Sequence, residues 1–384
     1  MPRDAEAQNP SSIEAPGAKA PAVAIVGATG AVGAELLHCL EKRDFPVRHL
    51  RLLASPRSAG RTLRFRGAEI PVEALSETSF AGIDLALFSA GAEISRRYAP
   101  LAVETGAIVV DNSSAFRKDP AVPLVVPEVN AATLAGHRGI VASPNCVAAV
   151  AVVALAPLHR VRPIRRIVAS TYQAASGAGA AAMEELVRST EAHLRGEPFE
   201  PKVLPHPAAF NVFSHNAAVD PESGYNGEEL KFMAEVRRLL DVPDLPIGIT
   251  CIRVPVLRTH AISLSIELEA PLSPEEARSL LAAAPGVRLV DDRAANHFPM
   301  PSEASGEDEV LVGRLRTDLA DPSGRTLALF VAGDQLLKGA ALNAVQIAEL
   351  LLGQAMPHPS AEHPRDAGRS DSRRHSPPAR EVAP

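Results

Sequence analysis

Residues 23–33 read Val23-Ala-Ile-Val-Gly-Ala-Thr-Gly-Ala-Val-Gly33, an apolar run that passes directly into a glycine-rich turn. An unbroken apolar run of this length predicts a strand that is buried on both faces, as in a parallel sheet. Gly27, Gly30 and Gly33 would permit a tight turn and bring the backbone close to a phosphate at the start of the next helix. The GxxGxxG spacing is a variant of the usual GxGxxG pattern. It predicts dinucleotide binding over the alternative of a purely structural turn.

Short apolar segments recur along the first part of the chain and alternate with helical or loop segments. We expect strands at 50–54, 85–88, 108–110 and 140–142, and a helix at 32–42. Apolar strands that alternate with helices predict a parallel sheet covered by helices on both faces.

The pattern changes after Cys146, where a second domain with antiparallel pairing is expected. The fold class is therefore α/β, with a Rossmann-type dinucleotide-binding domain and a mixed α+β catalytic and dimerisation domain. We expect helices at 147–158, 181–194, 228–240 and 340–352, and strands at 166–170, 249–256 and 262–268. The expected divisions are a disordered extension (1–20), the dinucleotide-binding domain (21–145), the second domain (146–338), a helix packed back on the first domain (339–355) and a disordered tail (356–384).

The composition excludes several classes of partner. The 384 residues carry a formal net charge of −6, whereas nucleic-acid-binding proteins usually have a basic surplus. Aromatic residues make up 4% of the chain and Trp is absent, which removes base-stacking platforms. The longest apolar run, 147–157, is about half of the ~20 residues that a membrane-spanning helix needs. Residues 1–20 lack the apolar core of a signal peptide. We therefore predict a cytoplasmic protein without nucleic-acid or membrane partners.

The cysteines and histidines do not predict a metal site. Cys39, Cys146 and Cys251 are too few and too widely spaced for a disulfide framework or a CxxC site, which favours a reducing compartment. None of the 12 His residues stands at HExxH spacing. We interpret His206 and His215 as structural or surface residues.

The residues after the second expected strand favour NADP over NAD. A carboxylate that would bind the ribose 2′-hydroxyl is missing there, and the sequence instead reads Ser55-Pro-Arg57-Ser58. Hydroxyl and guanidinium donors suit a 2′-phosphate, which a carboxylate would repel. The alternative is a polar turn with a solvated arginine.

Cys146 is the candidate nucleophile. It lies in Ser143-Pro-Asn-Cys-Val147, between a short strand and the start of a long apolar helix. Unpaired N–H groups and the helix dipole at that position would lower the thiol pKa. Cys39 and Cys251 lie in apolar segments and are expected to be small buried side chains.

Several motifs occur in the order typical of one family. They are VGATGAVG, ASPRSAG, DNSSAFR, VPEVN, SPNC, TYQAASGAG, NGEELKFMAE, CIRVPVLRTH and KGAALNAVQIAE. From residue 23 to 352 the chain thus resembles the aspartate-semialdehyde dehydrogenases. The resemblance implies reversible, NADPH-dependent reductive dephosphorylation of L-aspartyl 4-phosphate to L-aspartate 4-semialdehyde. That step feeds lysine, methionine and threonine biosynthesis.

The resemblance assigns catalytic roles to four residues. Cys146 would attack the acyl phosphate and form a thioester, which hydride then reduces. Asn145 would help to hold the developing oxyanion. Gln173 would orient the acyl group, with a loop-anchoring amide as the alternative. His260 matches the family's acid/base histidine, a role that imidazole fills near neutral pH.

Arg253 matches the family's ligand for the substrate α-carboxylate. Arg253 and His260 are seven residues apart, so one straight strand would point them to opposite faces. Both reach one site only if the chain bends between them, and Pro255 is a plausible break. Arg258 is the nearby competitor, which we expect to be more exposed.

A helix after Asn226 is expected to carry two more substrate ligands. Asn226 and Glu229 resemble a capping box, and Glu228 and Lys231 lie three residues apart on one face. By resemblance, Glu228 would bind the substrate amino group, while Lys231 and Arg117 would bind its phosphate. The alternative for Glu228 and Lys231 is a surface ion pair.

The resemblance also implies further cofactor contacts and an oligomer, a homodimer or a dimer of dimers. The chain departs from the family at Val147, where a hydroxyl residue is usual, and at Asp334-Gln-Leu-Leu-Lys338 in place of Asp-Asn-Leu-Arg-Lys. The second departure is expected to adjust the cofactor site, and neither removes a catalytic group. The residues expected to contact the cofactor are Gly27, Thr29, Gly30, Ala31, Val32, Gly33, Ser55, Arg57, Ser58, Ser89, Gly91 and Asn343.

Two alternative functions remain at this point. An N-acetyl-γ-glutamyl-phosphate reductase would use the same thiol chemistry on an acylated substrate, and Glu228, as a ligand for a free amino group, argues against it. A non-catalytic relative that acts as a binding or scaffold protein would not need Cys146.

Overall fold

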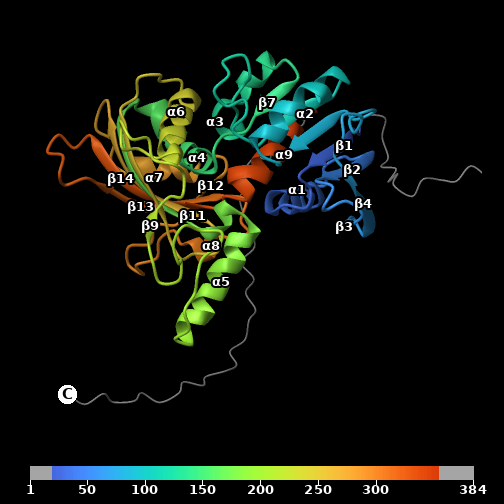
Figure 1. Cartoon of the computed structure of the whole chain (residues 1–384). Coiled ribbons are helices and arrows are strands. Elements are labelled where there is room, and N and C mark those ends of the chain that lie inside the picture. The colour runs from blue at the N-terminus through green and yellow to red at the C-terminus, as the bar shows by residue number, and fades with distance from the viewer. Residues whose placement is uncertain (1–19, 354–384) are drawn as a thin grey trace, which may run out of the picture.

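The structure, a computed structural model, describes residues 20–353 and has two lobes (Figure 1). Apart from Ala20, the predicted extension 1–20 and the predicted tail 356–384 lie outside the described residues. The combination of a nucleotide-binding α/β lobe and a mixed second lobe confirms the expected fold class. Within the described part of the chain, no helix is both long and apolar enough to cross a membrane.

The first lobe is built on a seven-stranded sheet of the described chain. Six strands run parallel, in the order of a doubly wound nucleotide-binding fold, and β3 adds an antiparallel edge. The strands in spatial order are β3 (Thr62–Phe65), β4 (Ala68–Ala74), β2 (His49–Ala54), β1 (Ala22–Val26), β5 (Leu85–Phe88), β6 (Ile108–Asp111) and β7 (Ile140–Ala142).

Helices cover both faces of this sheet, as predicted. Alternate residues of β1 enter different clusters: Val23 and Ile25 pack with α1 and α9, while Ala24 and Val26 pack with α2. Every residue of β1 is buried, which explains its unbroken apolar run. The helices of this lobe are α1 (Ala31–Lys42), α2 (Ala92–Glu104), α3 (Pro127–Asn130), the 3-10 turn Ala131–Gly136 and α9 (Leu342–Leu351).

The second lobe contains a mixed seven-stranded sheet among the described residues. The two strands expected to be antiparallel, β10 and β11, do run in opposite directions, but they are not neighbours because β8 lies between them. The strands in spatial order are β12 (Val287–Leu289), β13 (Val310–Thr317), β14 (Thr326–Gly333), β11 (His260–Leu268), β8 (Ile164–Gln173), β10 (Ile247–Arg253) and β9 (Phe213–Ser214).

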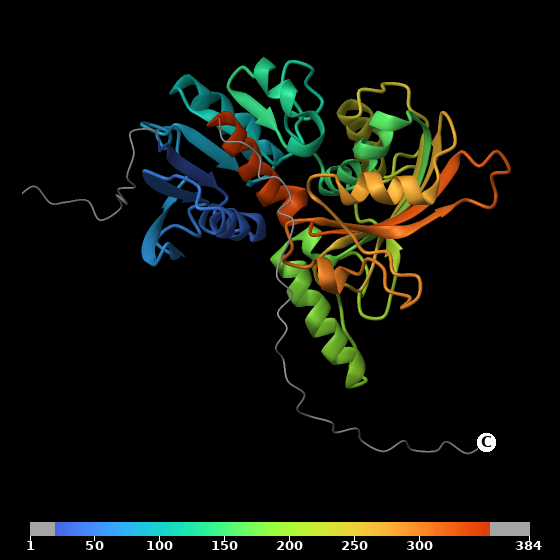
Figure 2. The same ribbon diagram turned by 180° about the vertical axis from the view of Figure 1, so that it is seen from behind.

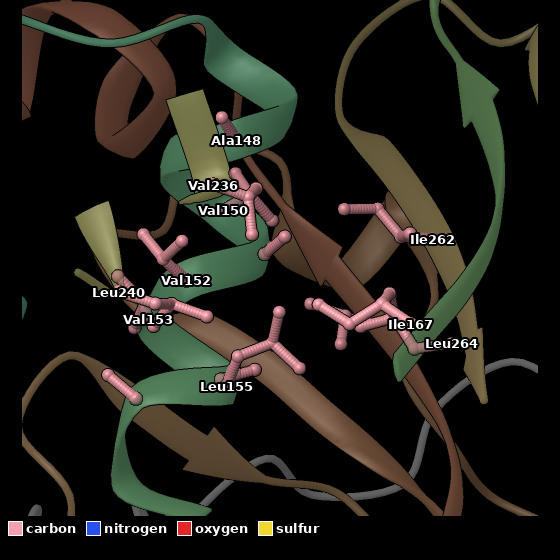
Figure 3. Packing of buried hydrophobic residues seen from close by; sticks show 14 of the residues in the cluster. Ala148, Val150, Val152, Val153, Leu155, Ile167, Val236, Leu240, Ile262 and Leu264 are labelled. Atoms are coloured by element: carbon pink, nitrogen blue, oxygen red, sulfur yellow. The ribbon is translucent and has the colours of Figure 1, made fainter. Parts of the chain in front are cut away.

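One face of the second sheet packs on a helix that is buried almost all round. That helix, α4, contacts Ile167 of β8 and Ile262 and Leu264 of β11 on one side and α6 on the other (Figure 3). The opposite face exposes Val168 and Tyr172 of β8. The helices of this lobe are α4 (Cys146–Val161), the 3-10 turn Ala175–Ala178, α5 (Ala180–Leu194), α6 (Gly227–Leu239), α7 (Pro274–Ala282) and α8 (Pro301–Ala304).

The chain returns to the first lobe after β14. It does so through a π-helical segment, Leu337–Ala341, which continues as α9. The expected helix at 340–352 is therefore α-helical only from Leu342, because the preceding turn is wider. Helix α9 lies against α1 and β6, and Figure 2 shows it inside the first lobe, while α5 projects away from the body.

Candidate active site

A cavity of about 370 Å³ opens between the two lobes. Its walls come from the turn after β1, the segments after β5 and β6, the start of α4 and the segment between β14 and α9. It therefore lies at the carboxyl ends of parallel strands, where open α/β sheets bind ligands. The predicted site residues in its lining are Gly30, Ala31, Val32, Ser89, Gly91, Arg117, Asn145 and Cys146.

The turn after β1 fits a dinucleotide phosphate. Gly27 has φ +88°, and a Cβ there would lie 2.9 Å from the carbonyl oxygen of Ser89. A Cβ on Gly33 would lie 2.3 Å from the carbonyl oxygen of Gly27, so α1 can pack this closely only with glycine. Helix α1 begins after Gly30 without a side-chain cap, which leaves its first N–H groups for an anion.

A second cavity, of about 410 Å³, continues the first one around this turn. The two share Gly30 and Ser89 in their linings, and the second also contains Thr29 and Ser55. Arg57 is exposed in the turn after β2, outside that lining. Together, the cavities connect the predicted 2′-phosphate region with Cys146.

Asn145 is the N-cap of α4. Its Oδ1 accepts hydrogen bonds from the N–H groups of Val147 (3.0 Å) and Ala148 (3.4 Å), and its Nδ2 donates to Glu228 Oε1 (2.9 Å). Its own N–H donates to Glu235 Oε2 (2.5 Å). One N–H of the Asn145 Nδ2 is thus engaged by Glu228. In this arrangement Asn145 positions the start of α4, and it also lines the cavity.

The prediction of a lowered thiol pKa is wrong for this arrangement. Burial raises the pKa of Cys146 to about 12, and the negative charge of Glu228 adds to the effect. Arg117, Arg253 and the Val147 N–H oppose it without overcoming it. Removing the charged sulfur from water outweighs one helix N-terminus when a carboxylate lies nearby.

The π-helical segment packs directly against the nucleophile. A Cβ on Gly339 would lie 2.7 Å from Cys146 Cβ and 3.1 Å from its Cα. Gly339 also lines the cavity. The absence of a side chain at this position therefore lets the segment that joins the lobes contact Cys146.

Arg253 and His260 meet at one residue, Ala174, as the predicted bend requires. Strand β10 ends at Arg253 and β11 begins at His260, with Pro255 in the connection between them. The Ala174 N–H donates to His260 Nδ1 (3.0 Å), and Arg253 Nη1 donates to the Ala174 carbonyl (2.6 Å). A Cβ on Gly177 would lie 2.9 Å from His260 Nε2 and 3.2 Å from Arg253 Nη1.

The hydrogen bond to Nδ1 defines the protonation of His260. Because Nδ1 accepts the Ala174 N–H, a neutral ring carries its proton on Nε2. Nε2 is buried without a hydrogen-bond partner among residues 20–353. Burial lowers the pKa of His260 well below its ordinary value, and Arg253 and His215 act in the same direction. His260 is thus a neutral side chain with one uncommitted N–H.

Arg253 is held so that one edge of its guanidinium remains available. Its Nη2 donates to Asn216 Oδ1 (2.8 Å), while Nε has no partner in the described part of the chain. Arg258 is more exposed, as expected, and is paired with Glu35 and Asp334. Arg253 is therefore the better candidate for binding a carboxylate.

Helix α6 begins with the predicted capping box. The Asn226 side chain accepts from the N–H of Glu229, whose carboxylate accepts from the Asn226 N–H. This start fixes Glu228 and Lys231 on one face, where Lys231 Nζ and Glu228 Oε2 are 3.7 Å apart. Glu228 is buried and Lys231 is half-exposed, so the pair is not a simple surface ion pair.

Gln173 joins the same group through Glu228. Gln173 Nε2 donates to Glu228 Oε1 (3.2 Å), and Thr171 Oγ1 donates to Gln173 Oε1 (3.1 Å). Burial opposes the charge on Glu228, but His215, Asn145 and Lys231 together lower the pKa of Glu228. Glu228 therefore presents a buried carboxylate beside the thiol.

Arg117 is fixed by three contacts. Its Nε donates to the Ser143 carbonyl (2.9 Å), its Nη2 donates to the Asn112 carbonyl (2.7 Å), and its Nη1 lies 3.4 Å from Glu235 Oε1. Burial raises the pKa of Glu235. Glu235 thus links α6 both to Arg117 and to the residue before the nucleophile.

The sequence interpretation missed several residues of this site. Ser176, Gly177 and Gln335 line the cavity, although none was among the predicted site residues. His215, expected to be structural or at the surface, is close enough to Glu228 to act on its pKa, and burial lowers the pKa of His215 to about 4. The polar run Ser214-His-Asn216, which follows the apolar pair Val212-Phe213, is the signal that could have indicated His215.

Asn343 lies outside the cavity. Its Nδ2 donates to the Val125 carbonyl and to Ser143 Oγ, both at 3.0 Å, and its Oδ1 accepts from Lys338 Nζ (3.1 Å). Lys338 is fully buried and also bonds to the carboxylate of Glu128. These bonds do not support the predicted contact of Asn343 with the cofactor.

Two family models match the chain. Residues 22–137 match the model described as "Semialdehyde dehydrogenase, NAD binding domain", and residues 155–338 match "Semialdehyde dehydrogenase, dimerisation domain". The aspartate-semialdehyde dehydrogenase of Synechocystis is 51% identical over 330 residues, which are 86% of this chain and 97% of that protein. The Aquifex aeolicus protein of the same name is 49% identical over 339 residues, 87% and 98% of the two chains.

Solved structures show the same likeness. Aspartate semialdehyde dehydrogenase II from Vibrio cholerae is 41% identical, with a TM-score of 0.84 over 88% of this chain and 100% of that chain. A structure of the same protein complexed with ASA gives the same values. A Candida albicans structure with NADP, 23% identical with a TM-score of 0.66, covers 86% and 98% of the two chains and shares the fold.

Proposed function

The chain belongs to the aspartate-semialdehyde dehydrogenase family, and on this premise we propose how its residues carry out the reaction. The reaction is the reversible reductive dephosphorylation of L-aspartyl 4-phosphate to L-aspartate 4-semialdehyde. One observation carries the proposal: Cys146 lines an interdomain cavity together with the glycine-rich turn. The two alternative functions gain no support from the relatives.

The first domain binds a nicotinamide dinucleotide, which we propose to be NADP. The glycine turn and the open start of α1 would hold its pyrophosphate. Ser55 lines the adjoining cavity, and Arg57 in the same turn would pair with the 2′-phosphate. When bound, the reduced cofactor supplies the hydride that the reaction requires.

The charged residues around Cys146 match the charges of the substrate. The free Nε edge of Arg253 would bind the α-carboxylate, and the buried carboxylate of Glu228 would bind the ammonium group. Arg117 and Lys231 would hold the phosphate from two different segments. Gln173, already bonded to Glu228, would orient the acyl group.

Cys146 would displace the phosphate. Its sulfur bonds to the acyl carbon, the bond from that carbon to the phosphate oxygen breaks, and the thiol proton leaves with the phosphate. A proton path through the phosphate accommodates a thiol whose pKa is raised to about 12. The product is a thioester on Cys146, whose carbonyl carbon would then accept hydride. The C–S bond breaks as the aldehyde forms, and the released sulfur takes up a proton.

His260 would act as a hydrogen-bond donor rather than as the base expected from the sequence. Its Nδ1 is occupied by the Ala174 N–H, so a neutral ring has no free nitrogen that could take a proton. Its uncommitted Nε2–H would stabilise negative charge on the carbonyl oxygen when thiolate or hydride adds. This is the part first expected of Asn145.

The second domain supports a homodimer, because residues 155–338 match a dimerisation domain. We propose that the uncovered sheet face, with Val168 and Tyr172, forms the contact between the two copies. A dimer of dimers would need a further contact surface.

The decisive test is phosphate-dependent reduction of NADP⁺ with L-aspartate 4-semialdehyde. Wild type and the Cys39→Ala control are expected to be active, since Cys39 is buried within α1, whereas Cys146→Ala is expected to be inactive. If Cys146→Ala is as active as wild type, Cys146 is not the nucleophile. If only the N-acetylglutamyl semialdehyde supports NADP⁺ reduction, the proposed substrate is wrong.

A further inference from the structure

Thr259, the residue before His260, has an unusual backbone conformation. It has φ +81° and is fully buried. A β-branched residue disfavours this region, so the conformation persists only where neighbouring groups hold it. Two polar contacts do so: the Thr259 N–H donates to Gln335 Oε1 (2.8 Å), and its hydroxyl lies 2.9 Å from Ser305 Oγ.

Gln335 uses the other end of its amide on a second segment of the site. Its Nε2 donates to Ser176 Oγ. Ser176 precedes Gly177, which lies against the ring of His260 and the guanidinium of Arg253. One buried amide therefore joins the backbone that carries His260 to the segment that covers the His260 ring.

Gln335 is also placed beside the nucleophile. It precedes the π-helical segment, and its Cβ would lie 3.2 Å from a Cβ on Gly339, the residue that contacts Cys146. The Oε1 of Gln335 accepts from Thr259 and one N–H of its Nε2 donates to Ser176, so the amide plane is fixed between these two segments.

We propose that Gln335 is a positioning residue for His260: it holds Thr259 in its positive-φ conformation and fixes the Ser176–Gly177 segment over the imidazole. The inference rests on the proposed function insofar as it concerns catalysis. Its structural content, the fixed orientation of His260, can be measured without turnover.

The first experiment compares Gln335→Met with wild type. Met keeps the length of the side chain and removes both hydrogen bonds, so His260 Nε2 is expected to lose its fixed place. We expect kcat to fall on the order of tenfold to 100-fold. The KM for NADP⁺ and the thermal midpoint should change little. An unchanged kcat, or a loss confined to the KM for NADP⁺, would overturn the positioning role.

A second variant separates positioning from general damage. Glycine adopts φ +81° without strain, so Thr259→Gly is expected to recover most of the lost kcat in the Gln335→Met background. If the double variant is no better than Gln335→Met, the hold on Thr259 is not how Gln335 acts.

The third measurement is independent of activity. In ¹⁵N-histidine-labelled protein, the His260 signals, assigned with His260→Gln, should show an unprotonated Nδ1 and a protonated Nε2. In Gln335→Met they should shift toward an average of the two tautomers. Identical His260 signals in both proteins would refute the proposal, even if the enzyme used a different substrate.

Discussion

Adding one methyl group at Gly339 should move the nucleophile. In Gly339→Ala the new Cβ would lie 2.7 Å from Cys146 Cβ, whereas ordinary contact begins near 3.4 Å. The two atoms must therefore separate by about 0.7 Å. Cys146 is the first residue of α4, so either its side chain, with the sulfur, moves or the interdomain segment that carries Gly339 moves. A displacement close to 1 Å costs about 100-fold in rate, so we expect kcat to fall by that order.

The stability change should be much smaller than the change in activity. Alanine is favoured over glycine within a helix by about 1 kcal/mol. Overpacking costs about 1–3 kcal/mol, so the net loss should be at most about 2 kcal/mol. The assay is steady-state NADP⁺ reduction with L-aspartate 4-semialdehyde and phosphate, together with thermal unfolding.

Gly248→Ala in β10 is the matched control, because its Cβ would meet nothing within 4 Å. It should keep wild-type kcat. If Gly339→Ala also keeps kcat within about twofold of wild type, the tight packing of the interdomain segment on Cys146 does not determine the rate.

Three other perturbations test separate parts of the site. Lys338→Met leaves the Glu128 carboxylate buried without its cation and should cost about 3–5 kcal/mol, or about 4–7 °C in Tm for this size. Adding Glu128→Gln should recover most of the lost stability. A double variant as unstable as Lys338→Met would show that the unpaired Glu128 carboxylate is not the cause. With the thiol pKa raised to about 12, alkylation of Cys146 in the ligand-free enzyme should rise about tenfold per pH unit from pH 7 to 9; a plateau near pH 7 would show a stabilised thiolate. Arg57→Ala should raise the KM for NADP⁺ on the order of tenfold and leave the KM for NAD⁺ unchanged. Equal effects on both KM values would show that Arg57 does not contact the 2′-phosphate.

Local patterns in the sequence predicted several elements, although the long strands β13 and β14 were not expected. Asn226 and Glu229 fix the start of α6 through contacts within one helical turn, so the pattern determines the structure there. The strand before Gly27 is likewise specified by burial on both faces. The bend between Arg253 and His260 followed from strand periodicity together with the resemblance, because seven residues cannot place both side chains on one face of a straight strand and the family uses both in one site.

The errors concern effects that act across the chain. The pKa of Cys146 is raised first by burial and then by Glu228, which comes near the thiol through the packing of α6 on α4. The proximity of His215 to Glu228 was not predicted for the same reason. The cofactor contact of Asn343 came from the resemblance, and the sequence did not indicate that its side chain bonds to Val125, Ser143 and Lys338.

The position of α9 has a consequence for synthesis of the protein. The first domain is completed by residues 342–351, which bury Leu342, Val345 and Ile347 against the cluster that contains Val23 and Ile25. When a ribosome has finished residue 145, this sheet still lacks a helix on one face. About 200 more residues must follow, which takes roughly 10–40 s at elongation rates of about 5–20 residues per second. Through that interval the nascent chain exposes the apolar surface that residues 342–351 cover in the folded protein.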